Sequence, residues 1–590
     1  MDVIATAGHV DHGKSALVRA LTGMEPDRWA EERRRGMTID LGFAWMTLPS
    51  GADVAFVDVP GHERFLGNML AGVGPAPAVL FVIAADEGWQ PQAEEHLQVI
   101  DALGVAHVLL VVTKSDLTDP AAAADAALRR IAATRIGDVA HVTASATTGD
   151  GLPELRAALD RLVGDIPAPD VAAPVRLWID RAFTIKGAGS VVTGTVTGGT
   201  LRLGDRLRLE PAGREVTVRG LQSCGEASDE VAATARVAVN LRGVERADLR
   251  RGMALTTPGR WHRTTELDAL ITSDLPPAGV VVHVGSAAVP ARLRRLSDRA
   301  IRVRLSGPLP LHVGDRLLLR DPLRRRVAAA DVASLDPPPL RRRGDAARVG
   351  SALRVPTAAD DVIRAEGLVR VEQLRAMGRC DDPVAARRVA DWWVSPDTWS
   401  RWHGQLLDAM HNDPGLRDDD VPGGMPLPGR SIESLRHLLD VPAGDIVTSL
   451  AAEIPGLVVA DGRVRPASTL TAEVPGLSQL THRFAADPLA APDADELKTI
   501  DPGLLAHAVR SGRLLHLGHG VYVGADAPTR VVQTLAGLPQ PFTVSAARQA
   551  LTSTRRVVLP LLEHLDAARM TRRLDDGRRV LLASGVSLDL

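Results

Sequence analysis

The 590-residue chain has a formal net charge of −3 and two cysteines. The charge excludes an overall basic nucleic-acid-binding surface, and the distant cysteines exclude a disulfide framework or a cysteine metal site. No apolar run approaches the roughly 20 residues of a membrane span, and the first strand follows Met1 too closely for a signal peptide. We therefore expect about four domains in a soluble, cytoplasmic monomer, with Cys224 and Cys380 as buried thiols.

The first motif is a phosphate-binding loop. Residues 8–15 read GHVDHGKS, between an apolar strand at 3–5 and a helical run at 16–21. This is the GxxxxGK[ST] pattern in its strand–loop–helix context, where backbone N–H groups and the helix N-terminus bind phosphate. Lys14 would reach the β- and γ-phosphates, and Ser15 would ligate Mg²⁺. The predicted nucleotide contacts of the loop are Gly8, Asp11, His12, Gly13, Lys14 and Ser15.

Strands predicted at 53–57, 79–83 and 108–112 alternate with helices, which predicts a parallel α/β sheet with its site at the carboxyl ends of the strands. The first of them leads into DVPGH at 58–62. Asp58 would bind Mg²⁺ through water, and the Gly61 N–H would contact the γ-phosphate. Thr38 would ligate Mg²⁺ only while a γ-phosphate orders its loop. His62 would orient the attacking water, the alternative being an exposed histidine without a role.

The strand at 108–112 leads into Thr113-Lys114-Ser115-Asp116. Asp116 can accept hydrogen bonds from N1–H and the 2-amino group of guanine, which adenine does not offer. Lys114 would lay its aliphatic stem over the base, and Ser145 with Ala146 would close the base pocket. The predicted ligands are therefore GTP and GDP with Mg²⁺. Thr113 stands where the NKxD motif has asparagine.

The motifs GHVDHGKS, RGMTI, DVPGHE and TKSD resemble those of translational GTPases of the elongation factor Tu class. Within that class, the threonine of TKSD resembles the selenocysteine-specific factors (SelB). The resemblance implies that Val10 and Met37 form an apolar gate that holds His62 away until the ribosome triggers GTP hydrolysis.

A GTPase domain is predicted at residues 1–170. Short strands at regular spacing follow at 174–262 and 263–340, which predicts two β-barrels. In the resembling family, the cleft between the GTPase and the first barrel holds the aminoacyl end of a tRNA. By that resemblance, Asp180 and Arg236 line a selenocysteinyl pocket, in which a fixed guanidinium would favour the selenolate anion. The alternative is a strand-end aspartate and a barrel-surface arginine.

Four small α+β winged-helix domains are predicted at 345–412, 413–470, 471–526 and 527–590, each with helices followed by a two-stranded wing. An elongation factor Tu would end before them. The tryptophans of the first module are better explained as core residues than as base-stacking platforms; they are Trp392, Trp393, Trp399 and Trp402.

The last module, at 527–590, holds nine arginines against five acidic residues. Arginines at a helix N-terminus and on a wing suit the phosphates and unstacked bases of an RNA hairpin; the alternative is a solvated basic face. By resemblance, this module binds the mRNA hairpin (SECIS) that specifies a UGA codon for selenocysteine. The predicted contacts are Arg555, Arg556, Arg572, Arg573, Arg578 and Arg579.

The sequence therefore predicts a GTPase that delivers selenocysteinyl-tRNA to the ribosome at such codons. A Tu-like GTPase whose winged helices bind DNA or a protein partner is the alternative.

Overall fold

The structure is a computed structural model in which the described residues are 1–26, 38, 40–62, 65–272, 279–321, 327–411, 429–460, 462–467, 475–500, 502–510 and 512–582. The chain divides into two units, Met1–Gln405 and Leu406–Leu590. Met37, one half of the expected gate, lies outside the described residues.

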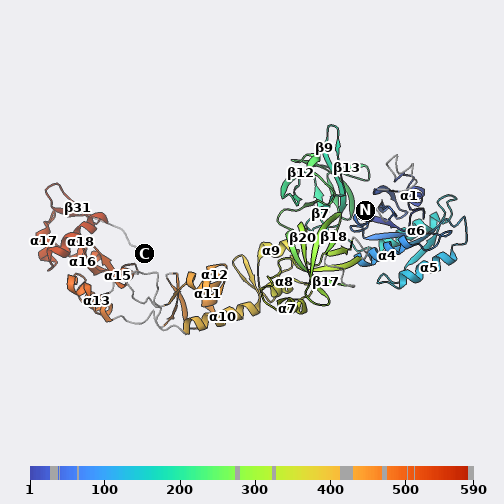
Figure 1. Ribbon diagram of the computed structural model, residues 1–590. Helices are drawn as coiled ribbons and strands as arrows, with labels where there is room; N and C mark the ends of the chain where they lie inside the picture. The colour runs from blue at the N-terminus through green and yellow to red at the C-terminus, as the bar shows by residue number, and fades with distance from the viewer. Residues whose placement is uncertain are drawn as a thin grey trace. The chain divides into compact units, whose positions relative to one another are not determined.

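The N-terminal domain, blue to cyan in Figure 1, is built on a six-stranded sheet in the order β2-β3-β1-β4-β5-β6. All strands run parallel except β2, which is antiparallel to β3. Strand β4 reads AVLFVIA and is buried throughout, as expected for a parallel strand covered on both faces. The strands are β1 (Asp2–Ala7), β2 (Gly42–Thr47), β3 (Asp53–Asp58), β4 (Ala78–Ala84), β5 (His107–Thr113) and β6 (Ala140–Thr143).

Helices cover both faces of this sheet. Val3 and Ala5 of β1 belong to the core beneath α3, α4 and α5, whereas Ile4 points to the core beneath α1 and α6. This alternation is the period of two expected for a strand. The helices are α1 (Lys14–Thr22), α3 (Leu66–Val73), α4 (Pro91–Leu103), α5 (Ala121–Ala132) and α6 (Leu152–Gly164).

Two β-barrels follow in the same unit. In the first, the sheet runs β11-β16-β7-β9-β15-β12-β13, and pairing of β11 with β12 closes it. Its strands are β7 (Arg176–Trp178), β8 (Arg181–Ile185), β9 (Gly189–Val196), β11 (Arg206–Glu210), β12 (Arg214–Ser223), β13 (Glu226–Ser228), β15 (Ala235–Arg242) and β16 (Ala254–Thr256), with β10 (Thr200–Arg202) paired to β14 (Glu230–Ala232) and a short 3-10 helix at Arg246–Asp248.

The second barrel is closed in the order β17-β20-β19-β18-β21-β22. Inward residues such as Ile301 and Val303 are fully buried, and on the outer side Arg302 forms an ion pair with Asp268. The strands are β17 (His262–Ile271), β18 (Gly279–Val284), β19 (Ala287–Arg295), β20 (Ala300–Leu311), β21 (Arg316–Arg320) and β22 (Val327–Ser334).

The first winged-helix module lies mostly in the N-terminal unit. Trp399 and Trp402 of α10 are buried, which confirms core packing for these two, whereas Trp392 and Trp393 are half-buried beneath the guanidinium groups of Arg370 and Arg388. Its elements are α7 (Asp345–Ala352), α8 (Ala359–Glu366), β23 (Leu368–Arg370), α9 (Val371–Ala376), β24 (Arg387–Val389), β25 (Trp392–Val394) and α10 (Pro396–His411).

The second unit contains three further modules of helices followed by a two-stranded wing. The second module has β26 (Arg430–Ser431), α11 (Ile432–Leu439), α12 (Gly444–Glu453), β27 (Leu457–Ala460) and β28 (Arg463–Pro466). The third has α13 (Pro475–Ala486), α14 (Ala494–Lys498), α15 (Pro502–Arg510), β29 (Leu514–His516) and β30 (Tyr522–Gly524). The last has α16 (Ala527–Leu535), α17 (Val544–Ala550), α18 (Arg555–Ala567), β31 (Thr571–Arg573) and β32 (Arg579–Leu581).

The expectation of two buried thiols is wrong. Cys380 is exposed and Cys224 is half-buried, because both lie in loops rather than in a strand or helix that faces a core. Among the described residues, no helix combines the length and the apolar character needed to cross a membrane.

The Arg302–Asp268 pair gives a stability prediction. Their side chains are 6% and 0% exposed, and Arg302 donates two hydrogen bonds to the carboxylate, at 2.7 and 2.9 Å. Asp268→Ala leaves the buried guanidinium of Arg302 without its carboxylate partner, which should lower the free energy of unfolding by about 3–5 kcal/mol. Arg304→Ala removes only an exposed pair with Glu266 and should cost less than about 1 kcal/mol. Hydrogen exchange of the β17 and β20 amides measures both, and equal effects would contradict the prediction.

Candidate functional site

The phosphate-binding loop joins the end of β1 to the start of α1. Three of its residues have positive φ: Gly8 (135°), Asp11 (62°) and Gly13 (78°). A Cβ at Gly8 would lie 2.1 Å from the carbonyl oxygen of Val82, so only glycine lets the loop pass this close to β4. The loop and the α1 N-terminus together form the kind of anion site that binds phosphate.

The three predicted magnesium ligands lie together. Ser15 Oγ donates to Asp58 Oδ2 at 2.6 Å and is 2.9 Å from Thr38 Oγ1. The Asp58 side chain is fully buried, and Thr6 Oγ1 donates to its other oxygen at 2.7 Å. These oxygen atoms match the hard donors that Mg²⁺ prefers.

The loop after β3 lies against the phosphate-binding loop. A Cβ at Gly61 would come within 2.6 Å of Val10 N and 2.7 Å of Lys14 Nζ, so only glycine lets the two loops approach this closely. Lys14 Nζ donates to the carbonyl oxygens of Gly8 and His9, at 3.1 and 2.7 Å. His62 is half-buried.

Residues 113–116, the predicted base-recognition loop, are tied to the phosphate-binding loop. Thr113 Oγ1, buried at the end of β5, donates to the carbonyl oxygen of His12 at 2.7 Å. A hydroxyl thus makes a cross-link between the two loops without asparagine. Asp116 is exposed and Ala146 is half-buried, whereas Ser145 is buried, with its Oγ accepting hydrogen bonds from the N–H groups of residues 147 and 148.

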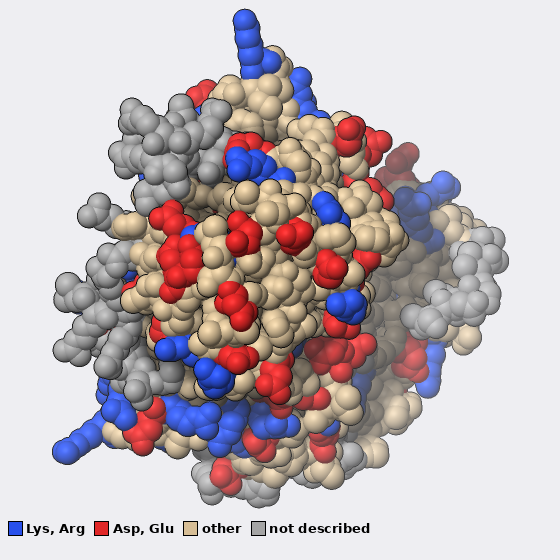
Figure 2. Space-filling view, turned by 90° about the vertical axis from the view of Figure 1, so that its right-hand side faces the viewer, with Lys and Arg blue, Asp and Glu red and all other residues tan. Residues whose placement is uncertain are grey.

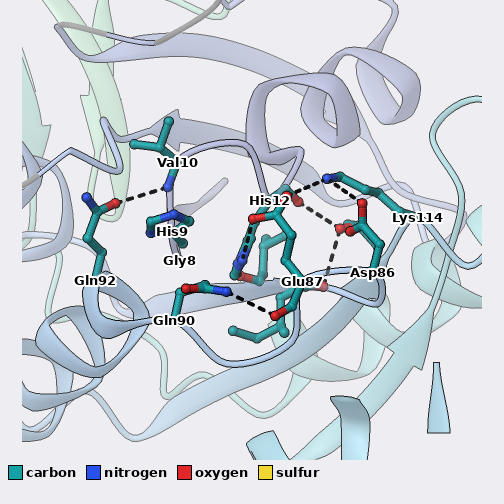
Figure 3. A network of polar contacts seen from close by, with 12 residues as sticks. Gly8, His9, Val10, His12, Asp86, Glu87, Gln90, Gln92 and Lys114 are labelled. Atoms are coloured by element: carbon teal, nitrogen blue, oxygen red, sulfur yellow. Dashed lines mark hydrogen bonds and ion pairs between the residues drawn. The ribbon is translucent and has the colours of Figure 1, made fainter. Parts of the chain in front are cut away.

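Helix α4 supplies two contacts that were missed from the sequence, and Figure 3 shows the one between Gln92 and Val10. His96 Nδ1 accepts a hydrogen bond from Gly8 N–H at 3.0 Å, and Gln92 Oε1 accepts one from Val10 N–H at 3.3 Å. The only signal in the sequence was their i, i+4 spacing, which places both side chains on one helix face but does not say what that face meets.

The predicted pocket residues Asp180 and Arg236 form an ion pair with two contacts, one of them 2.8 Å between Nη2 and Oδ1. The side chains are 5% and 13% exposed, so Arg236 is not a solvent-exposed barrel arginine. Its guanidinium carbon lies 3.8 Å from the ring centroid of Phe43, on β2 of the GTPase-like domain. The pair therefore lies at the junction of this domain with the first barrel.

Two more arginines of that barrel, both missed from the sequence, join it to the same domain. Arg181 donates to Asp40 Oδ2 at 3.1 Å and to the carbonyl oxygen of Leu41 at 3.0 Å. Arg251 donates to Asn68 Oδ1 at 2.6 Å. The segment just after Thr38 is thus held by the barrel.

Charge on the face shown in Figure 2 is mixed, with acidic and basic side chains interspersed. This face therefore presents no broad positive field of the kind that attracts nucleic acid.

The six arginines predicted in the last module divide into two groups. Arg579 is 2% exposed, and its Nε donates to Asp566 Oδ2 of α18 at 2.8 Å. Arg578 is exposed and donates to Asp576 at 2.6 Å within the wing. The other exposed members are Arg555, Arg556, Arg572 and Arg573. Arg579 therefore holds the wing against α18, and five arginines face solvent.

Known families match three parts of the chain: Elongation factor Tu GTP binding domain at residues 1–165, Elongation factor Tu domain 2 at 189–256 and Elongation factor SelB, winged helix at 533–580. The selenocysteine-specific elongation factor of Haemophilus influenzae is 32% identical over 445 residues, 70% of this chain and 71% of that protein. The chain belongs to the selenocysteine-specific elongation factors.

The selenocysteine-specific elongation factor of Desulfomicrobium baculatum is 40% identical over 337 residues, and that match spans only about half of each protein, 54% of this chain and 53% of the relative. The crystal structure of a bacterial selenocysteine-specific elongation factor, EF-Sec, aligns over 99% of this chain and 100% of its own with a TM-score of 0.78 and 23% identity, which supports the fold. The predicted order of GTPase domain, two β-barrels and tandem winged helices is confirmed.

The buried histidines give a pH prediction. Burial lowers the pKa of His96 to about 3, against an ordinary 6.5. Between these two pKa values the unfolded chain binds a proton on His96 and the folded chain does not. The contribution of neutral His96 to the free energy of unfolding is therefore complete above about pH 6.5 and declines as the pH falls toward the pKa of the folded state.

His96→Gln keeps a neutral acceptor for Gly8 N–H but does not titrate. Its thermal midpoint should fall less than that of the unchanged protein between about pH 7 and pH 5. Identical pH dependence of the two midpoints would contradict the assignment.

Proposed function

We propose that this elongation factor binds GTP and delivers selenocysteinyl-tRNA to the ribosome at UGA codons marked by an mRNA hairpin. The observation that carries the proposal is the Asp180–Arg236 pair at the junction of the GTPase domain and the first barrel. The pair supplies a largely buried guanidinium. In the elongation factor Tu class, the cleft between the GTPase domain and the first barrel holds the aminoacyl end of a tRNA.

The nucleotide site is proposed to hold GTP with Mg²⁺, which would neutralise charge on the phosphates during phosphoryl transfer. Ser15 and Thr38 would be direct ligands and Asp58 would act through water. Lys14 would leave the loop carbonyls that it contacts now and reach the β- and γ-phosphates. The Gly61 N–H would contact the γ-phosphate, and Gly61 lies close to Lys14, since a Cβ on it would be 2.7 Å from Lys14 Nζ.

His62 is proposed to orient the water that attacks the γ-phosphate. Val10 would hold it away from that water together with Met37. Gln92 of α4 accepts a hydrogen bond from the backbone N–H of Val10. This bond fixes the backbone of the gate residue against α4. Hydrolysis should then be slow until the ribosome moves His62 past the gate.

Arg236 is proposed to discriminate selenocysteine from serine by charge. A selenol is largely ionised at neutral pH, whereas a serine hydroxyl stays neutral, so a guanidinium stabilises only the former. The ring of Phe43 and the carboxylate of Asp180 fix the orientation of that guanidinium. Fixing it in advance lowers the ordering cost of binding.

In the last module, Arg555 and Arg556 at the start of α18 and Arg572, Arg573 and Arg578 on the wing are proposed to contact the hairpin. Helix N-termini and guanidinium groups bind phosphate oxygens, and guanidinium planes also stack on unpaired bases. Arg579 is assigned a supporting role, because its side chain is buried against Asp566.

Protection of the aminoacyl ester tests the delivery proposal. With GTP, the factor should protect selenocysteinyl-tRNA from hydrolysis much better than seryl-tRNA with the same tRNA body. Arg236→Gln should reduce this preference by about tenfold or more, as for loss of a largely buried charge-assisted contact. Equal protection of the two by the unchanged protein would contradict the pocket.

Hairpin binding tests the last module. Arg555→Ala and Arg572→Ala in the full chain should each weaken binding of a hairpin RNA by about 1–3 kcal/mol if they contact bases. Arg530→Ala is the matched control and should change little, because it removes only an exposed pair between Arg530 on α16 and Asp526 just before that helix. Loss of affinity in the control alone would contradict the assigned surface.

A further inference from the structure

Helix α4 holds the phosphate-binding loop through two hydrogen bonds. Gly8 N–H donates to His96 Nδ1 at 3.0 Å, and Val10 N–H donates to Gln92 Oε1 at 3.3 Å, the bond drawn in Figure 3. His96 is buried, and burial lowers the pKa of His96 to about 3. The ring is therefore neutral near pH 7, and Nδ1 keeps the lone pair that accepts the Gly8 N–H. Two backbone N–H groups of the loop are thus positioned by side chains of α4.

The helix face that carries Gln92 and His96 continues toward the second barrel. Residues 92, 96, 99 and 103 have the i, i+4, i+7, i+11 spacing of one helix face. Val99 and Leu103, in the C-terminal half, belong to the same hydrophobic cluster as Leu318 of β21, and α4 packs against β21 and its neighbour β22. One face of one helix therefore meets the phosphate-binding loop at its N-terminal half and the second barrel at its C-terminal half.

Leu318 lies on the outer side of the second barrel. Its neighbours Leu317 and Leu319 belong to the hydrophobic cluster inside the barrel, whereas Leu318 belongs to a cluster of the GTPase domain. This alternation is the period of two expected for a strand. Leu318 is nevertheless fully buried, so the outer face of β21 is covered by the GTPase domain, and α4 packs on this strand.

Arg316 of the same strand lies at the end of α4. A Cβ on Gly104, the residue after the helix, would come within 2.0 Å of Arg316 Nη1. Arg316 Nε donates to Asp331 Oδ1 at 2.8 Å, which orients the guanidinium. A cation is favourable at a helix C-terminus, because the last carbonyl groups carry partial negative charge. The second barrel therefore contacts α4 through an apolar side chain and through a fixed charge.

We infer that the second barrel sets the dissociation rate of guanine nucleotide through α4, with Gln92 and His96 as the positioning residues that connect this helix to the phosphate-binding loop. The inference rests on the proposed GTP site. Contact with the barrel restricts the movement of α4, and the two hydrogen bonds extend this restriction to the loop. A loop that is ordered before it binds loses less entropy on binding, so loosening α4 should weaken the binding of the phosphates.

The test is the dissociation rate of a fluorescent GDP from the full chain, measured for Leu318→Ala and for its matched control Leu317→Ala. Leu318→Ala removes the contact with α4 and should raise the rate by about two- to thirtyfold, the range for residues that couple separate parts of a protein. Leu317→Ala makes the same truncation one residue away, inside the barrel, and should leave the rate nearly unchanged.

A second pair of variants guards against misfolding of the alanine variants. Arg316→Gln removes the charge at the end of α4 from a partly exposed site and should give a smaller increase than Leu318→Ala. Arg304→Gln, which removes an exposed pair with Glu266, should give none.

A background without the two acceptors of α4, Gln92→Ala with His96→Leu, separates positioning from general loosening of the fold. This background should itself release GDP faster. Leu318→Ala should add nothing to its rate, because the effect of Leu318 acts through those acceptors. His96→Gln, which keeps an acceptor for the Gly8 N–H, should raise the rate less than His96→Leu.

Three results would each overturn the inference: equal rates in Leu318→Ala and Leu317→Ala, unchanged rates in both Leu318→Ala and Arg316→Gln, or an additive effect of Leu318→Ala in the background variant. If the unchanged protein fails to bind GDP, the proposed GTP site itself is wrong. Tight GDP binding with unaffected barrel variants refutes only the role of the second barrel.

Discussion

The buried carboxylate of Asp58 is the constraint on which the nucleotide site depends. A carboxylate with no exposure to water must be hydrogen-bonded or paired, and here hydroxyl groups from Thr6 and Ser15 donate to its two oxygens. These bonds join the ends of β1 and β3 to the start of α1, and Ser15 in turn contacts Thr38. The segment proposed to respond to a γ-phosphate is therefore attached to the same group of oxygens that is proposed to bind Mg²⁺.

That segment also leads to the first barrel. Thr38 is followed within a few residues by Asp40, which pairs with Arg181, and by Phe43, on which Arg236 lies. A change in the position of Thr38 on nucleotide binding would thus be transmitted to the arginine proposed to bind the selenolate. On the other side, α4 contacts Gly8 and Val10 through His96 and Gln92 and packs on β21 and β22 of the second barrel. Both barrels therefore contact elements that hold the phosphate-binding loop.

In the last module, the carboxylate of Asp566 binds one of the arginines and leaves the others exposed to solvent. Asp566 accepts hydrogen bonds from Thr571 and from Arg579, one on each strand of the wing. The wing is thereby fixed against α18, and the arginines that remain in solvent are held on a rigid surface. A preorganised surface loses less entropy when it binds RNA than a mobile one does.

The sequence by itself determined the domain order and which loops meet at the proposed nucleotide site. The three motifs follow strands, and the carboxyl ends of parallel strands meet at one edge of a sheet, so local pattern was enough to bring Ser15, Asp58 and Thr113 together. Only the tertiary structure decided that Arg579 is buried while Arg578 is exposed, that Phe43 lies under Arg236, and that His96 and Gln92 accept hydrogen bonds from the phosphate-binding loop. These contacts join residues far apart in the chain, and periodicity says which face a residue occupies but not what packs against that face.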